Sequence, residues 1–200
     1  MVARVRFGVL GALFCVFVFG QVIEFESGGM HYQTLTRRGV TVMFAQMPTH
    51  VREFSILQVA VSNGSQAPYT IRPEDFRYVH ADGSAIPAAP ARSVVNALLE
   101  KGSRSDVIHL VSAYEAALYG VQRMLSTNGY EQRRQAALAE VQSTKVKAAA
   151  AASAIALVQI KLTPGQSTDG AVFFPNEGKL LTGGRLVINT NTDTFQFKTE

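Results

Sequence analysis

The sequence contains a single cysteine, Cys15, and no tryptophan. Cys15 lies within the N-terminal stretch that we expect to be removed, so the remaining chain has no cysteine. That remainder can form neither a disulfide bond nor a thiolate metal site. It must be held together by an apolar core. About 180 residues are enough for one domain with its own core, or for one domain that carries an insertion.

The N-terminal apolar run is too short to span a membrane, which takes about 20 residues. This run covers residues 7–19, follows Arg4 and Arg6, and ends before Gly20. A positive start, a short apolar segment and a small residue before a polar one are typical of a secretory signal peptide. We therefore expect residues 1–20 to be a signal peptide cleaved after Gly20. An uncleaved N-terminal anchor is the alternative.

Neither sign of charge dominates the chain. Its 19 basic and 15 acidic residues give a formal net charge of +4, and removing Arg4 and Arg6 leaves +2. So small a charge does not indicate nucleic acid as a partner. After signal cleavage no transmembrane span is expected. The predicted location is therefore the periplasm or the outside of the cell, in association with the envelope.

Short segments of alternating apolar and polar residues predict β-strands on both sides of the middle of the chain. In residues 54–62, for example, one face carries Leu57, Val59 and Val61 and the other carries Gln58, Ala60 and Ser62. Turn-forming residues separate the segments, such as Gly39 within the first hairpin and Asn63-Gly64-Ser65. The predicted strands cover residues 31–35, 40–45, 54–62, 69–71, 76–80, 167–174, 186–188 and 195–197.

Between these groups of strands the apolar period becomes helical. Pro90 and Gly102 bound a predicted helix over 91–101, and a second helix opens at Ser105 or Asp106. The apolar stripe of the second helix consists of Val107, Leu110, Val111, Tyr114 and Leu118. A capping box formed by Asn128 and Glu131 predicts a third, alanine-rich helix from about Tyr130 to Leu157. Two helices broken near Ser143-Thr144 are the alternative.

The order of elements is strands, then helices, then strands. Single strands do not alternate with single helices, which argues against a parallel α/β sheet. We expect a mainly β fold: one antiparallel β-sandwich interrupted by an insertion of two to four helices. Residues 21–91 form the first part of the sandwich, 92–157 the helical insertion and 158–200 the second part.

Three segments resemble the immunoglobulin-like domains of bacterial exported proteins of unknown function. In the stretch that begins at Leu57, residues 61–68 follow the pattern V-x-N-x-S-x-x-P and residues 73–76 follow P-x-D-F, and residues 162–174 follow L-x-P-G-x-S-x-x-G-x-V-x-F. The matching residues are turn glycines and prolines and core aromatics such as Phe76 and Phe173. The resemblance implies an immunoglobulin-like sandwich, and it implies no catalytic residue. The helical insertion departs from the simple domain.

The sequence shows no catalytic, metal or cofactor motif, so no such residues are assigned and no cofactor is expected. The histidines, which are His31, His50, His80 and His109, do not have the spacing of a metal site. The acidic pair Glu74-Asp75 lies in a turn context, and turn chemistry explains it better than acid/base catalysis. Neither a Gly-x-Ser-x-Gly elbow nor a phosphate-binding glycine loop is present.

One stretch of the insertion is a speculative partner surface, because it joins two predicted helices and carries apolar and basic side chains. Its residues are Arg123, Met124, Leu125, Tyr130, Arg133 and Arg134. The first hypothesis is a non-catalytic binding or assembly module of the bacterial envelope, with another envelope protein as partner. A small ligand or glycan remains open. The alternatives are a hydrolase whose carboxylates, such as Glu74, Asp75 and Asp169, meet only in three dimensions, and a structural subunit of an envelope complex.

Overall fold

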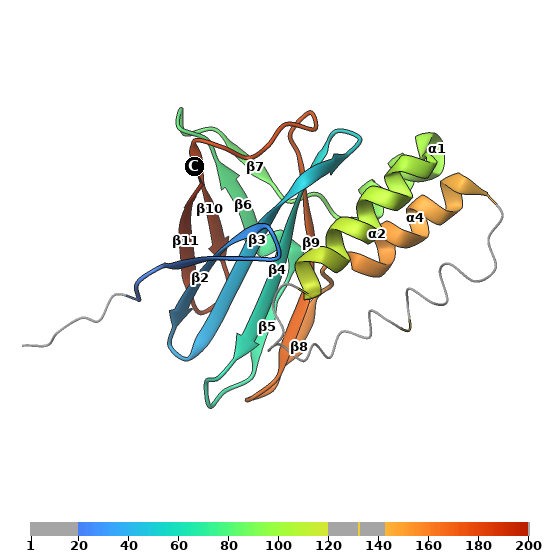
Figure 1. Cartoon of the computed structure of the whole chain (residues 1–200). Helices are drawn as coiled ribbons and strands as arrows, with labels where there is room; N and C mark the ends of the chain where they lie inside the picture. The colour runs from blue at the N-terminus through green and yellow to red at the C-terminus, as the bar shows by residue number, and fades with distance from the viewer. Residues whose placement is uncertain (1–19, 120–131, 133–142, 200) are drawn as a thin grey trace, which may run out of the picture.

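The computed structural model describes residues 20–119, 132 and 143–199 of the chain (Figure 1). In these residues the fold is mainly β, and every strand pair is antiparallel. Helices interrupt the strands in sequence, as the change of apolar period predicts. The expectation of a mainly β fold that carries helices is therefore confirmed.

The largest sheet has five strands in the order β1-β2-β3-β4-β9. Its first four strands follow one another along the chain, whereas β9 joins from far downstream. The strands are β1 (Ile23–Ser27), β2 (Met30–Arg37), β3 (Val40–Val51), β4 (Phe54–Asn63) and β9 (Ser167–Pro175). The register between β4 and β9 pairs Phe54 with Pro175 and Ser62 with Ser167.

A second sheet has four strands in the order β11-β10-β6-β7. These strands are β6 (Phe76–Val79), β7 (Ala85–Pro87), β10 (Gly184–Asn189) and β11 (Thr194–Thr199). A small third sheet pairs β5 (Tyr69–Ile71) with β8 (Ile160–Leu162). The 3₁₀ helix η1 (Pro73–Asp75) joins β5 to β6.

The two larger sheets face one another across an apolar core (Figure 1). Alternate residues of β3, β4 and β9 point into this core, where they meet aromatic residues of the four-stranded sheet. Phe44 of β3 and Phe197 of β11 lie edge to face, with ring centroids 5.0 Å apart. The buried members include Leu35, Val42, Phe44, Leu57, Val59, Val61, Phe76, Tyr78, Val172, Phe174, Leu186, Ile188, Phe195 and Phe197.

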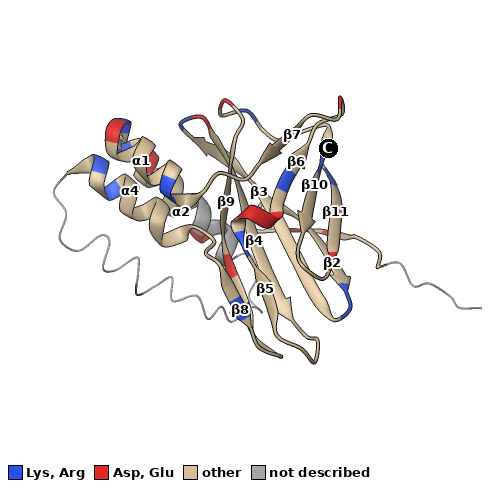
Figure 2. Ribbon diagram, turned by 180° about the vertical axis from the view of Figure 1, so that it is seen from behind, with Lys and Arg blue, Asp and Glu red and all other residues tan. Residues whose placement is uncertain are grey.

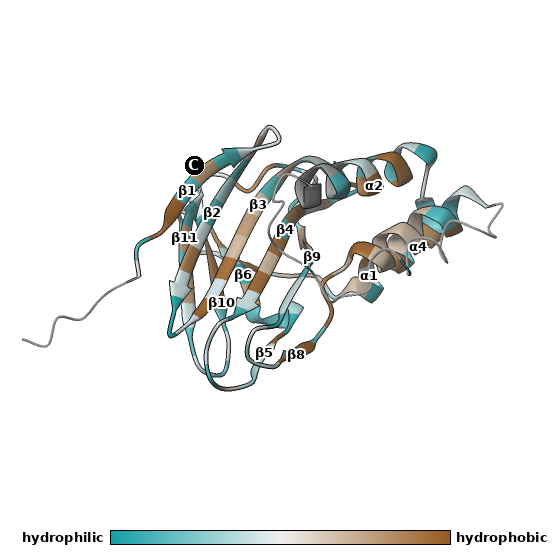
Figure 3. Cartoon of the chain, turned by 60° about the horizontal axis from the view of Figure 1, so that its bottom comes forward, coloured by the Kyte–Doolittle hydropathy of each residue, from teal (hydrophilic) through white to brown (hydrophobic). Residues whose placement is uncertain are grey.

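A layer of helices covers the opposite face of the five-stranded sheet (Figure 3). The helices are α1 (Ala91–Lys101), α2 (Arg104–Tyr119) and α4 (Thr144–Ile155). Val94 and Leu98 of α1 and Leu110 of α2 are fully buried. They share one apolar cluster with the outward-facing residues of the sheet, which include Tyr32, Met43, Ala45, Ile56, Ala60 and Phe173. The helices are therefore packed on the sheet.

Strand β4 is buried on both faces because it lies between the two cores. Leu57, Val59 and Val61 lie in the core between the two larger sheets. Gln58 and Ala60 lie on the opposite face, beneath the helices, where these residues are 5% and 7% exposed. The sequence assigns the faces correctly. It does not show that the more polar face is covered as well, since alternation is typical of a strand with one side in water.

Alanines dominate the buried side of helix α4, which faces other elements. It packs against α1 and α2 and lies against the sheet, and its buried residues are Ala148, Ala149, Ala151, Ala152, Ala154 and Ile155. A side chain of one methyl group lets neighbouring backbones approach closely. Helix α4 begins at Thr144, at the break that the sequence offered as the alternative. The predicted cap at Asn128 and Glu131 lies outside the described residues.

An ion pair fastens the start of α2 to the five-stranded sheet. The carboxylate of Asp106 accepts hydrogen bonds from the backbone N–H of Ser103, at 2.7 Å, and from its hydroxyl group, at 2.8 Å. The same carboxylate lies 2.8 Å from the guanidinium of Arg52, in the turn between β3 and β4. One side chain therefore caps the helix and links it to the sheet.

Replacing Asp106 with asparagine should reduce the free energy of unfolding by about 1 to 2 kcal/mol, because the Arg52 charge loses its partner. Denaturant unfolding followed by circular dichroism measures the change. Glu53→Gln is the matched control, since it removes an exposed acid from the same turn without touching the pair. Equal stability of D106N and E53Q would show that the ion pair contributes nothing.

Candidate functional site

The partner surface predicted from the sequence is not described by the structure. Arg123, Met124, Leu125, Tyr130, Arg133 and Arg134 all lie outside the described residues. That prediction therefore remains a prediction. The histidines lie on different elements: His31 on β2, His50 on β3, His80 after β6 and His109 on α2. Among the described residues, no group of three or more His, Cys, Asp or Glu side chains is placed to hold a metal ion.

The acidic pair at residues 74 and 75 serves the turn before β6. Asp75 is buried, and its carboxylate accepts a hydrogen bond from the backbone N–H of Arg72 at 2.9 Å. The Arg72 guanidinium lies 3.6 Å from the same carboxylate and donates to Asn191 at 2.9 Å. Burial raises the pKa of Asp75, and the bond from Arg72 partly offsets this rise. Glu74 is exposed beside it, and Figure 2 shows this acidic turn at the start of the four-stranded sheet.

The third candidate carboxylate lies on the other side of the five-stranded sheet. Asp169 of β9 is 4% exposed and points to the face that the helices cover. The Gln58 amide of β4 donates to its carboxylate at 3.5 Å, while Gln58 Oε1 is buried without a hydrogen-bond partner. Asp75 and Asp169 therefore lie in separate environments. The structure does not bring them together as a catalytic pair.

A cavity of about 230 Å³ opens between the two larger sheets beside β2 and β3. Inward-facing residues of these strands form one wall, and the segment 180–182 together with the end of β11 forms the other. Its lining mixes apolar and polar groups: His31, Gln33, Phe44, Gln46, Leu180, Leu181, Thr182 and Thr199. A concave apolar surface with a few polar groups is the usual form of a small-molecule site, although this cavity is smaller than most.

Two glutamine amides give the cavity its polar character. The Gln33 amide nitrogen donates to Glu24 and to the Lys198 carbonyl, both at 2.8 Å. Its Oε1 is buried and accepts no hydrogen bond. The Gln46 amide, oriented from its hydrogen-bond network, donates to the Leu181 carbonyl at 3.0 Å and accepts from the Leu181 N–H at 3.2 Å. The segment 180–182 is thereby fixed to β3. The side-chain oxygen of Gln33 has no hydrogen-bond partner.

Two further polar groups of the lining have partners within the protein. The Thr199 hydroxyl lies 3.2 Å from the Gly184 N–H and 3.2 Å from the Tyr78 hydroxyl. At the rim, His31 Nε2 lies 3.9 Å from a carboxylate oxygen of Glu24, and both side chains are about half exposed. The Thr199 hydroxyl therefore already has hydrogen-bond partners in the surrounding strands.

Sequence reasoning missed this cavity. Its lining comes from β2, β3, the segment 180–182 and β11, which lie together only after folding. One signal was present: Gln33 and Gln46 are polar residues on the strand faces that otherwise point to the core. A buried amide is costly unless it bonds, so such residues indicate a polar feature inside a fold.

Comparisons with known proteins do not assign the chain to a family. No protein-family model matches the sequence, and no curated protein matches it significantly. Among solved structures, the crystal structure of the yjhA protein from Bacillus subtilis is similar over 89% of this chain and 96% of that chain. The sequence identity is 8% and the TM-score is 0.37, a likeness too low to support an argument. None of the helices in the described part of the chain is long and apolar enough to cross a membrane.

Proposed function

We propose that the chain is an exported, non-catalytic binding module of the bacterial cell envelope, built on an immunoglobulin-like sandwich with a helical layer. It binds a small molecule in the cavity between β2, β3 and the segment 180–182. The mixed apolar and polar lining of this cavity is the observation that carries this proposal. The ligand has an apolar part and at least one hydrogen-bonding group, because the lining combines apolar side chains with amide, hydroxyl and imidazole groups.

The immunoglobulin-like scaffold is supported by a contact between the segments that carry the resemblance. The backbone N–H of Asn63 donates to Gln166 at 2.9 Å, and the N–H of Gly165 donates to Asn63 at 2.6 Å. The V-x-N-x-S turn and the L-x-P-G turn therefore lie side by side, although about 100 residues separate them. Export is supported by the signal-peptide pattern of residues 1–20.

The binding proposal is tested with benzyl alcohol, a small probe that combines an apolar ring with one hydroxyl donor. We expect chemical-shift changes in the amides of β2, β3 and segment 180–182, with a Kd of about 1 mM, since small ligands gain little energy. Thr182→Phe fills the cavity from an exposed position and should weaken binding about tenfold. Thr163→Phe makes the same change in the distant β8–β9 turn and should leave binding unchanged.

Toluene, which has the ring without the donor, should bind less tightly than benzyl alcohol. Equal binding of the two probes would remove the role given to the polar groups of the lining. Equal titrations of T182F and the wild-type protein would overturn the cavity as the binding site.

A further inference from the structure

Strand β1 is an open edge of the five-stranded sheet. In the described residues it pairs with β2 on one side and has no strand on the other. The opposite edge, β9, is covered. The N–H of Ala89 donates to Phe173 at 2.7 Å, and the N–H of Leu157 donates to Ala171 at 2.9 Å. Since backbone groups of an antiparallel strand point alternately to either side, part of the main chain of β1 faces outward.

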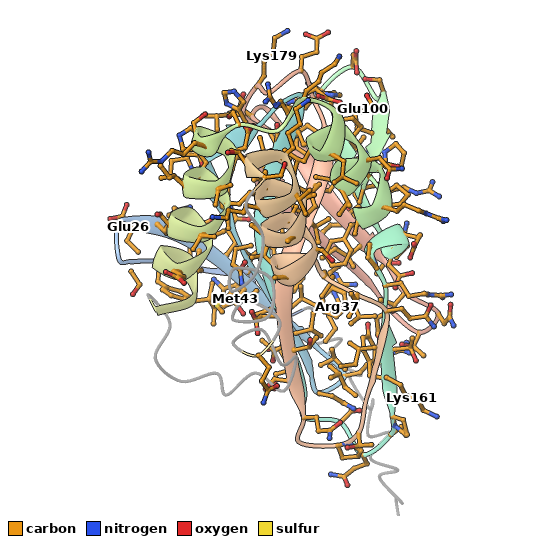
Figure 4. The ribbon with its side chains drawn as sticks, turned by 90° about the vertical axis from the view of Figure 1, so that its right-hand side faces the viewer. Glu26, Arg37, Met43, Glu100, Lys161 and Lys179 are labelled. Carbon is orange, nitrogen blue, oxygen red and sulfur yellow. The ribbon has the colours of Figure 1, made fainter. Side chains whose placement is uncertain are left out.

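The two faces of β1 carry different side chains: apolar ones on one face and acidic ones on the other. Ile23 and Phe25 point to the helix side, where they are 61% and 37% exposed, and Phe25 stacks on Tyr32 with ring centroids 5.2 Å apart. Glu24 and Glu26 point to the other side, opposite Gln33 and His31. Figure 3 shows β1 at the margin of the sheet with its apolar stretches, and Figure 4 shows Glu26 at the outer edge of the hairpin.

We infer that β1 is a docking edge for an extended segment of a partner protein, which adds to the sheet as a further strand. The segment alternates basic and apolar residues. Main-chain hydrogen bonds hold it to β1, its lysines or arginines lie beside Glu24 and Glu26, and its apolar residues lie beside Ile23 and Phe25. Edge addition of this type takes its affinity from the backbone and its specificity from alternate side chains.

The acidic face argues against a second copy of the chain as the occupant. In an antiparallel pair of β1 strands centred on Phe25, Glu24 of each copy would lie opposite Glu26 of the other. Like charges directly opposite one another destabilise a strand pair. The carboxylates of Glu24 and Glu26 attract a basic strand. Charge complementarity therefore favours a partner protein other than a second copy of this chain.

The edge is tested with three short peptides added to the full chain. One alternates lysine and valine, the second has the same composition with its lysines and valines in separate blocks, and the third alternates glutamate and valine. The first peptide should bind at least about tenfold more tightly than either of the others, since only it matches both faces of β1. Its binding should slow hydrogen exchange of the amides in β1, because they become hydrogen-bonded.

A charge-reversed variant supplies the control. Glu26→Lys should weaken binding of the alternating lysine peptide about tenfold, because Glu26 is exposed and lies on the acidic face. Glu100→Lys reverses an exposed charge at the end of α1, well away from Glu26 in Figure 4, and should have no effect. Equal binding of the alternating and block peptides would show that β1 attracts positive charge without pairing with an added strand. A dimer of the chain in light scattering, with no peptide binding, would assign the edge to a second copy. Either result overturns the inference.

Discussion

Replacing Gly170 with alanine is expected to destabilise the protein by about 3 kcal/mol. Gly170 lies in β9, and the chain crosses directly over it at Leu157. A Cβ atom added at Gly170 would lie 2.5 Å from Leu157 Cα and 2.7 Å from Leu157 N. These are backbone atoms, which cannot move aside as a flexible side chain can. The crossing is also fixed by the bond from the Leu157 N–H to Ala171.

Denaturant unfolding followed by circular dichroism tests this result, because the chain has no tryptophan to report by fluorescence. Gly83→Ala is the comparison variant. Gly83 has a φ of +87° and open space around its Cα, so alanine there meets backbone strain alone, which costs about 1 kcal/mol. If G170A were no less stable than G83A, the close crossing at Leu157 would not be rigid.

The second large effect is expected for Asn63→Asp, which should cost about 2 to 4 kcal/mol. Asn63 is fully buried at the end of β4. Its amide nitrogen donates to the Ala67 carbonyl at 2.8 Å and to the Leu162 carbonyl at 3.0 Å. Its Oδ1 accepts from the N–H and the hydroxyl of Ser65. An aspartate would accept the bonds from Ser65 but would turn a charged acceptor toward two carbonyl groups.

The loss in N63D should depend on pH. Burial and the two carbonyls raise the pKa of the new carboxyl in the folded state, so the folded protein binds a proton more readily than the unfolded chain. Stability should therefore recover in part as the pH falls, because a protonated carboxyl can donate one bond. Asn189→Asp is the control: Asn189 is exposed and only accepts, from Thr194 at 3.0 Å, so little change is expected. If the loss of stability in N63D did not vary with pH, it would arise from altered packing and not from the charge of the new carboxylate.

Much of the local structure follows from the sequence because it depends on neighbouring residues. The hairpin around Gly39, the strand at 54–62 and the turn at Asn63-Gly64-Ser65 all lie where alternation and turn chemistry predict them. The helix over 91–101 begins and ends as Pro90 and Gly102 indicate. Boundaries were less accurate: the strand expected at 40–45 extends to Val51, past a register shift between Gln46 and His50.

What the sequence could not supply depends on contacts between distant segments. Helix α4 fits between α1, α2 and the sheet because most of its side chains are single methyl groups, whereas an alanine-rich composition by itself is equally explained by high helix propensity. The cavity is formed by side chains from four parts of the chain. Two of its lining residues, Gln33 and Leu181, are about 150 residues apart in the sequence. The open edge at β1 could not be predicted either. Residues 23–27 are absent from the predicted strands, although Ile23 and Phe25 alternate with two glutamates, and which strand lies at an edge depends on pairing between distant segments.

The pairing of β4 with β9 has a consequence for how the protein is made. About 100 residues lie between these strands, so β9 leaves the ribosome roughly 5 to 20 s after β4. Until then, β4, which is buried on both faces in the folded protein, has an unpaired edge, and neither of its faces is fully covered. This interval is when the nascent chain is most exposed to aggregation or capture by chaperones. A chain in which β9 is missing or unpaired would therefore expose a strand edge of the kind that promotes aggregation.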